Sequence, residues 1–204
     1  SGDEVIAPNE TPLSYQIRNG NNPMISSSFA SMGCEVVEMF HVADNPERTN
    51  EVIASALDGS CDLVVTIGGI SAGKRDFFPA AFANSGVELA VKGAKIQPGK
   101  PVIVGRHESA VVLGLPGNPV SALACSCVFG WPIVRAMLGI TTALPWQRAS
   151  LTTSVKPNPH RLCFRPCQIM NGQVSIPQWQ GSGDLAHTAS THGLVQLPSS
   201  ELEL

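Results

Sequence analysis

The sequence predicts an α/β fold, with a three-layer α/β/α domain built on a mainly parallel sheet and a small all-β domain after it. Helix-start signals alternate with apolar strand-like runs over residues 1–140, which is typical of α/β domains. One of these runs, LVVTI at 63–67, is apolar throughout, as in strands that a parallel sheet buries on both faces. From residue 147 to 204 the chain instead has short β-like pieces with many prolines and glycines. We therefore expect one domain at 1–140 and a second, β-barrel-like domain at 147–204 that lacks an obvious closing strand.

The expected helices have recognisable start and stop signals. Asn22 and Pro23 begin a helix that Gly33 ends, and Asn45 with Pro46 begins the next, which runs to about residue 57. Asp76 is expected to cap a helix to residue 84, and a long apolar helix over 119–138 should be kinked at Pro132. The expected strands cover residues 34–40, 63–67, 87–91, 101–104, 111–113, 149–155, 162–169, 173–176 and 193–197.

Composition excludes several classes of protein. The chain has 204 residues, 43% of them hydrophobic, and a net charge of −3, which indicates a soluble globular protein without a large nucleic-acid surface. Its start has no signal-peptide pattern, and the missing initiator Met suggests a fragment of something larger. The longest apolar stretch, 120–134, is shorter than the roughly 20 residues that a membrane span needs, so we expect a buried helix and no membrane association.

The six cysteines show no disulfide-framework spacing, so we expect free thiols in a reducing, cytoplasmic compartment. Cys163 and Cys167, with His187 and His192, faintly resemble a zinc-ligand pattern. Positions four apart on a strand are about 13 Å from each other, which favours ordinary thiols over a zinc site. No Gly-x-Ser-x-Gly elbow supports a nucleophilic triad.

Four segments are expected to meet at one edge of the sheet, because ligands of open α/β sheets bind beyond the carboxyl ends of the strands. These segments are SGDE (1–4), HVADNP (41–46), GGISAGKRD (68–76) and GLPGNPVSA (114–122). Each lies at a strand end or a helix start. Their convergence is the main physical argument for a binding site.

The glycine-rich segment can hold an anion. Gly68, Gly69 and Gly73 let the backbone amides approach a phosphate, with Ser71 beside them. The pattern is one residue short of a Walker A loop, because Arg75 stands where that loop has the Ser or Thr that binds Mg²⁺. A different kind of anion-binding loop is therefore favoured over a nucleotide-triphosphate loop.

The segment GLPGNPVSA combines a stiff turn with a helix start. Pro116, Gly117 and Pro119 stiffen the turn, Asn118 can cap the helix, and Ser121 adds a hydroxyl. The free amides of the first helical turn could bind an anion, although simple capping would explain the same residues.

Acidic residues also gather at these positions, namely Asp3, Glu4, Asp44 and Asp76. Asp44 and Asp76 could simply cap helices, and their spacing alone favours that reading. Around a phosphate-binding pocket the same carboxylates could hold Mg²⁺.

The ordered set of segments resembles the molybdopterin molybdenumtransferase family, which includes MoeA and the gephyrin E domain. The stretches that carry the resemblance are SGDEVIAP, QIRNGNNPMI, GCEVVEMFHVADNPE, DLVVTIGGISAGKRDFF, IQPGKPVIVGR, GLPGNPVSAL and QGSGDLAHTASTHGLVQLP. Any one of these is weak, but together and in this order they are highly specific and cover nearly the whole chain. The resemblance is to the C-terminal half of the family, which has two further domains ahead of this segment.

The resemblance implies a chemistry and a set of site residues. The family inserts molybdate into adenylylated molybdopterin with release of AMP, requires Mg²⁺, and completes its cleft across a homodimer. Its functional acids fall on Glu4, Asp44 and Asp76, with Asp44 and Asp76 as the Mg²⁺ ligands. The implied substrate-binding residues are Gly2, Asp3, Asn21, Gly68, Gly69, Ser71, Gly73, Lys74, Pro116, Gly117, Asn118, Pro119 and Ser121.

One departure concerns positive charge. The family often has lysines where this chain has Gly93 and Gln97, so Lys74 in the loop is expected to supply charge instead. Two alternative functions stay open. One is the related molybdopterin adenylyltransferase, also a candidate partner, which normally lacks the second domain. The other is a non-enzymatic, gephyrin-like scaffold module.

Overall fold

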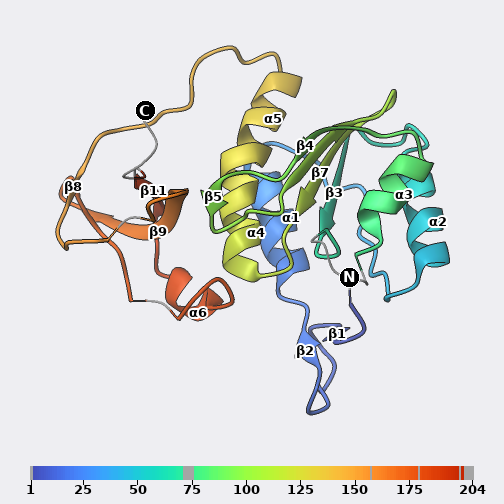
Figure 1. Cartoon of the computed structure of the whole chain (residues 1–204), viewed down its shortest axis with the longest axis horizontal. Coiled ribbons are helices and arrows are strands. Elements are labelled where there is room, and N and C mark those ends of the chain that lie inside the picture. The colour runs from blue at the N-terminus through green and yellow to red at the C-terminus, as the bar shows by residue number, and fades with distance from the viewer. Residues whose placement is uncertain (1, 71–75, 157, 179, 198, 200–204) are drawn as a thin grey trace. The chain divides into compact units, whose positions relative to one another are not determined.

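The computed structural model describes residues 2–70, 76–156, 158–178, 180–197 and 199 (Figure 1). Ser71, Gly73 and Lys74 lie outside the described residues. The chain packs as two compact units: unit 1 comprises residues 1–94 and 101–117, and unit 2 comprises residues 95–100 and 118–204. A division into folding domains at 140–147 stays a prediction.

A four-stranded sheet forms the centre of unit 1, in the order β3-β7-β6-β4. β3 (Leu63–Ile67) and β7 (Val111–Leu115) pair in parallel, with Leu63 opposite Val111 and Ile67 opposite Leu115. β6 (Ile103–Arg106) is antiparallel to both β7 and β4 (Glu88–Lys92). The α/β class is confirmed, but the sheet is mixed rather than mainly parallel, because a short turn joins β6 to β7 as an antiparallel pair and β4 is also antiparallel to β6.

Helices cover both faces of this sheet, which gives the expected three layers. Figure 1 shows α2 (Pro46–Ala56) and α3 (Phe78–Asn84) on one face and α1 (Asn21–Ser31) on the other. The aromatic rings of Phe78 and Phe82 stack with their centroids 6.0 Å apart in the core between α2, α3 and the sheet. The buried side chains of that core are Ile53, Leu57, Val64, Ile70, Phe78, Ala81, Phe82, Val87, Ile103, Ala110 and Val112.

The helix-start signals are confirmed at one helix and wrong at two. The side chain of Asn45 accepts a hydrogen bond from the Arg48 amide at 2.7 Å, and Pro46 follows as the first residue of α2. α1 begins before Asn22, and the Asn22 amide donates to Asn19 Oδ1, so Asn19 supplies the turn-forming side chain there. α3 begins only at Phe78, so Asp76 precedes the helix and is not its cap.

The segment at 34–40, expected to be a strand, forms no ladder with the described part of the chain. Its large apolar side chains Val36, Val37, Met39 and Phe40 are exposed. Alternating apolar residues favour an extended backbone, but a strand also needs a neighbour to pair with.

A small parallel ladder near the start was not expected. β1 (Val5–Ile6) pairs with β2 (Ile17–Arg18), which leads directly into α1. Each strand has only two residues, too few for a sequence pattern to reveal. The ladder ties the first segment of the chain to the start of α1.

Unit 2 is built around the nine-residue strand β9 (Leu162–Met170). β10 (Gln173–Ser175) and β11 (Gly193–Leu197) flank it in antiparallel fashion, while β5 (Ile96–Gln97) pairs with it in parallel and β8 (Ser150–Leu151) pairs with β10. The strands expected at 162–169, 173–176 and 193–197 are confirmed. The short helix α6 (Leu185–Thr188) was not expected.

The long helix of unit 2 has three parts: α4 (Pro119–Cys125), a π-helical turn at Ser126–Gly130 and α5 (Trp131–Met137). The irregularity therefore lies in the turn before Pro132, where the proline ring would collide with a carbonyl of a regular α-helix. At 19 residues, the helix is long and apolar enough to cross a membrane, so the argument from length against a span was wrong. Val120, Ala122 and Cys125 are nonetheless fully buried inside the protein, as in a core helix.

All six cysteines are free thiols, and burial makes one of them very hard to ionise. Cys125 Sγ lies 3.7 Å from the Gly99 carbonyl oxygen, and burial raises the pKa of this thiol to about 12. Only the thiolate reacts readily with electrophiles. The partly exposed Cys127 is two positions further along the same helix and serves as an internal control.

We predict that Cys125 stays unmodified when the native protein is treated with a maleimide at pH 8, while Cys127 reacts slowly. Both thiols should react fully in denaturant, because unfolding removes the burial that raises the pKa. Peptide mapping by mass spectrometry measures each site separately. Modification of native Cys125 at the rate of Cys127 would contradict the burial of this helix face.

Candidate functional site

The first segment of the chain meets the segment around residue 43. The Gly2 amide donates a hydrogen bond to the Val42 carbonyl at 3.4 Å, and the Asp44 amide donates to Asp3 Oδ1 at 3.1 Å. Two of the four expected segments are therefore in contact. The Asp3 carboxylate accepts this hydrogen bond from the backbone, and the bond fixes the position of residue 44 relative to residue 3.

Glu4 folds back over Gly2. Gly2 has a positive φ of +124°, and a Cβ atom built on it would lie 2.6 Å from Glu4 Oε2. The Glu4 carbonyl accepts the Ile17 amide at 2.7 Å, which anchors this residue to the β1–β2 ladder. The positive φ favours glycine at this position, whereas the Glu4 carboxylate lies at the end of an exposed, flexible side chain.

The other two expected segments meet at the ends of β3 and β7. The Gly68 amide donates to the Leu115 carbonyl at 2.9 Å, one step beyond the last ladder pair. Gly117 lies directly against this turn, since a Cβ atom on it would be 3.4 Å from the Gly68 Cα. Asn21, the first residue of α1, donates from Nδ2 to the Gly117 carbonyl at 2.7 Å.

The glycine pair after β3 has the backbone conformation that the sequence predicts for an anion-binding loop. Gly68 and Gly69 have φ values of +80° and +63°, the left-handed region that favours glycine. Successive residues in such conformations can turn their amides toward one anion. The amide of Gly68 already donates a hydrogen bond to the Leu115 carbonyl, so the part of the loop that can face a ligand begins at Gly69.

Two buried oxygen atoms near these strand ends have no hydrogen-bond partner in the described structure: Asn21 Oδ1 and Thr66 Oγ1. The bond to Gly117 fixes the orientation of the Asn21 carboxamide, so its oxygen is a true unpaired acceptor. Thr66 is the fourth residue of β3. Its Oγ1 faces the neighbouring strand β7, where a Cβ atom built on Gly114 would lie 3.5 Å from it. Unpaired buried polar atoms are rare and often mark places where a ligand or water binds.

Thr66 was missed by the sequence analysis, because a threonine inside an apolar strand gives no functional signal. A second missed residue is Ser182, in the segment QGSGD. Its local signal is the glycine on each side, which is typical of a turn and does not indicate a function.

Ser182 forms hydrogen bonds with two residues at the start of the long helix. Its carbonyl accepts the Val120 amide at 2.9 Å, and its hydroxyl accepts a bond from Asn118 Nδ2 at 2.8 Å. Asn118 occupies the cap position but makes no side-chain capping bond to the helix, and Ser121 is 5% exposed. Pro119 lacks an N–H and the Val120 amide is bound to Ser182, so neither of the first two helical positions offers a free amide to an anion.

The lysines nearest in sequence to Gly93 and Gln97 are Lys92 and Lys95, and they belong to different units. Lys92 ends β4, at the edge of the sheet opposite β3, and Lys95 belongs to unit 2. Gln97 Oε1 accepts a hydrogen bond from Asn158 Nδ2 at 3.0 Å, so Gln97 has a structural role within unit 2. Gly93 has a φ of +117°, which a lysine would adopt only with strain.

The carboxylates do not form a complete metal cage. Among the described residues, no three His, Cys, Asp or Glu side chains are grouped so that they could hold a metal ion. Mg²⁺ nevertheless commonly uses only one or two carboxylates together with water and substrate phosphates. The described carboxylates are therefore compatible with an ion that is held partly by water and a phosphorylated substrate.

Comparison with known proteins places this geometry in a family. Residues 1–136 match the family model described as a probable molybdopterin binding domain. The chain is 30% identical to the molybdopterin molybdenumtransferase of Synechococcus elongatus over 206 residues, covering 98% of this chain and 50% of that protein. It is 32% identical to molybdopterin molybdenumtransferase 2 of Mycobacterium tuberculosis over 215 residues, covering 100% of this chain and 52% of that protein.

A solved structure agrees with the sequence matches. The molybdopterin biosynthesis MoeA protein from Pyrococcus horikoshii superposes with a TM-score of 0.82 at 27% identity, covering 97% of this chain and 48% of that chain. The chain thus spans about half the length of the relatives it matches. With the family model matched over most of its length, the chain belongs to the family of molybdopterin-binding domains found in molybdopterin molybdenumtransferases.

Proposed function

We propose that this chain serves molybdenum cofactor biosynthesis as the catalytic part of a molybdopterin molybdenumtransferase. Such an enzyme inserts molybdate into the dithiolene of adenylylated molybdopterin and releases AMP. The observation that supports this most is the meeting of Gly68, Gly117 and Asn21 at the carboxyl ends of two parallel strands. That is where open α/β sheets bind their ligands.

The glycine turn after β3 supplies the phosphate contacts in this proposal. Gly69 and the residues up to Asp76, with Ser71, Gly73 and Lys74 among them, would surround the phosphate groups. Pro116 and Gly117 hold the neighbouring turn rigid against it. The unpaired Asn21 Oδ1 would accept a hydrogen bond from an amino or ring N–H group of the pterin.

No nucleophilic residue is required. A bound substrate that is held in the reactive geometry needs mainly positioning and neutralisation of developing charge. Glu4 would orient the substrate from its place over Gly2, with Asp3 fixing the neighbouring backbone through the Asp44 amide. The segment 2–4 therefore acts as a preformed wall of the site.

Mg²⁺ would be held by Asp44 and Asp76 together with substrate phosphates and water. When bound, the ion supplies positive charge that stabilises the leaving phosphate. Asp44 is fixed through its backbone bond to Asp3, so its side chain starts from a defined position. Asp76 lies just before α3, outside the helix.

The proposal also includes the oligomeric state, the cellular compartment and the source of the substrate. A homodimer would complete the cleft, the protein would act in the cytoplasm, and a molybdopterin adenylyltransferase would supply the adenylylated substrate. The adenylyltransferase activity itself is the alternative for this chain, since it shares the α/β unit. A gephyrin-like scaffold role is the non-enzymatic alternative.

The decisive experiment separates these three functions. Calorimetry with adenylylated molybdopterin and Mg²⁺ should detect binding to the 204-residue chain, and the protein as encoded by its complete gene should release AMP only when molybdate is added. Consumption of ATP with free molybdopterin would instead establish an adenylyltransferase. The absence of binding heat would exclude a catalytic role for this chain and leave the scaffold function.

We predict that Gly68→Ala weakens the binding of adenylylated molybdopterin about tenfold or more, because a distorted turn loses hydrogen bonds to a charged group. The matched control is Gly86→Ala, since Gly86 has a similar φ (+77° against +80°) but open space around it. Both variants should lower Tm by about 2–4 °C through backbone strain of about 1 kcal/mol. Equal affinities of the two variants would show that the Gly68 turn does not bind substrate.

We predict that Asp44→Asn lowers the affinity in the presence of Mg²⁺ but changes it little when the ion is omitted. The amide keeps the size of the side chain and removes the charge that attracts the cation. Glu88→Gln is the control, because Glu88 is an exposed carboxylate on β4, at the far edge of the sheet. An Mg²⁺ dependence that Asp44→Asn leaves intact would remove Asp44 from the ion site.

We further predict that Lys74→Ala weakens the binding of a phosphorylated pterin, because no other lysine is expected in the loop. Titration with the phosphorylated and dephosphorylated pterin measures this difference directly. An unchanged affinity for the phosphorylated form would mean that the resemblance of this loop to a Walker A motif is coincidental.

A further inference from the structure

The two units of the chain have opposite charge. By sequence, unit 1 has thirteen Asp or Glu residues and six Lys or Arg, whereas unit 2 has three acidic and seven basic residues. The sequence of residues 109–183 contains no Asp or Glu and five Lys or Arg. The small net charge of −3 therefore results from an acidic unit 1 and a basic unit 2. A basic surface attracts anionic partners.

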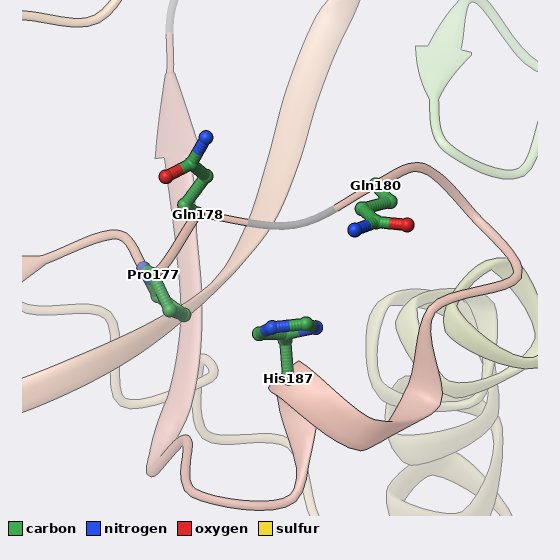
Figure 2. A pocket seen from close by; sticks show the side chains of 4 residues that line it. All are labelled: Pro177, Gln178, Gln180 and His187. Carbon is green, nitrogen blue, oxygen red and sulfur yellow. The ribbon is translucent and has the colours of Figure 1, made fainter.

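Asp184, the one acidic residue of unit 2 that the structure describes, is bound within the unit. Its side chain is 12% exposed, and its Oδ2 lies 2.7 Å from His187 Nδ1 and accepts a hydrogen bond from the Gln180 amide at 2.8 Å. Figure 2 shows His187, the partner of this carboxylate, projecting from α6. Arg148 and Lys156, in contrast, are exposed, so the charge that described unit 2 presents to solvent is mainly positive.

The end of α5 is an exposed apolar surface inside the stretch without acidic residues. Residues 136–140, which we call the helix tip, are all exposed. Three of them are large and apolar: Met137 (42% exposed), Leu138 (60%) and Ile140 (41%). Trp131 is also exposed and lies about 9 Å behind Met137 along the helix axis. Apolar side chains that are exposed together often mark an interaction surface.

The backbone of the helix tip is closed by its own hydrogen bonds. The Ile140 amide donates to the Arg135 carbonyl at 2.8 Å, and the Gly139 amide donates to the Ala136 carbonyl at 3.0 Å. With Gly139 at a φ of +71°, this is the Schellman arrangement that ends many helices. Arg135 Nη2 also donates to the Thr142 carbonyl at 2.7 Å, which holds the chain that follows the tip.

This combination favours a lipid surface over a nucleic acid. Single-stranded nucleic acids bind to basic proteins by stacking their bases on aromatic side chains, whereas the large side chains of the helix tip are aliphatic. Unpaired backbone groups are costly in lipid, and the internal bonds of the tip reduce that cost. Basic and apolar side chains act together at the boundary between anionic headgroups and acyl chains.

We propose that the helix tip docks unit 2 on an anionic lipid bilayer. Met137, Leu138 and Ile140 enter the boundary between headgroups and acyl chains, where apolar helix faces are buried by about 5–10 Å. Arg135, about 3 Å behind Met137 along the axis, lies at the level of the lipid phosphates. Docking of this kind requires no membrane span, and it replaces the expectation of no membrane association. The surface does not depend on the proposed function.

The test is flotation of the complete 204-residue chain with two kinds of vesicle. One consists of phosphatidylcholine alone, and the other of phosphatidylcholine and phosphatidylglycerol in equal parts. We expect binding to the anionic vesicles that weakens as salt is added, because salt screens the attraction. Binding to the neutral vesicles should be weaker by about tenfold or more, since each basic residue near an anionic surface contributes about fivefold.

The double variant Met137→Ser/Leu138→Ser tests the apolar contact. It should weaken binding to the anionic vesicles about tenfold or more, because two large side chains no longer leave water for lipid. The matched control is Val37→Ser/Met39→Ser, which replaces two apolar side chains of unit 1 that are 63% and 59% exposed. This control should bind like the wild type. All four side chains are exposed, and thermal unfolding verifies the fold of both variants.

The charge of Arg135 is tested separately from its bond to Thr142. Arg135→Gln should weaken binding about fivefold, the effect of one basic residue near an anionic surface. Arg135→Lys should restore most of this loss, because lysine keeps the charge although it lacks the planar guanidinium. Equal binding by the two variants would show that Arg135 acts only through the structure of the helix end, which would overturn its place at the phosphates.

Four results would overturn the proposal as a whole. They are absence of binding to anionic vesicles, equal binding to neutral vesicles, equal binding by the wild type and the helix-tip variant, and an equal loss in the unit 1 control. Binding of a single-stranded oligonucleotide without binding of vesicles would assign the basic unit to nucleic acid instead. Gly68→Ala should bind vesicles like the wild type, so failure of this proposal and failure of the proposed function are separate results.

Discussion

The parallel pairing of β3 with β7 is the constraint on which the candidate site depends. Parallel strands end at the same edge of a sheet, so the turns that follow them are brought together although they are almost 50 residues apart in the chain. The bond from the Gly68 amide to the Leu115 carbonyl extends this pairing into the turns themselves. Gly117 and Asn21 then add to an arrangement that the sheet has already fixed.

Glycine is favoured in the turn after β3 by the backbone conformation. At Gly68 and Gly69 the backbone has a positive φ, which a side chain would make unfavourable. At Gly117 a Cβ atom would lie 3.4 Å from the Gly68 Cα, an ordinary van der Waals contact, so the approach of the two turns does not itself exclude a side chain there. The two glycines after β3 leave backbone rather than side chains facing the space beyond the strand ends.

Much of this arrangement could be predicted from the sequence, but only where the signal is local. The strand at 63–67, the cap at Asn45 and three strands of unit 2 (β9, β10 and β11) follow from residue patterns within a few positions. The segment at 34–40 has the same local pattern and yet pairs with no described strand, because pairing depends on a neighbour elsewhere in the chain. The unpaired oxygen atom of Thr66 could not be predicted either, since burial is a property of the folded state.

The start of α4 shows most clearly how tertiary contacts can occupy groups that the local sequence leaves free. The turn before this helix has the prolines and the asparagine of an exposed helix start, and the amides of such a start attract anions. Ser182, more than 60 residues further along the chain, uses the Val120 amide and the Asn118 side chain instead. In the proposed site, an anion at the strand ends would therefore depend more on the amides of the turn after β3, where Gly68 and Gly69 have positive φ values.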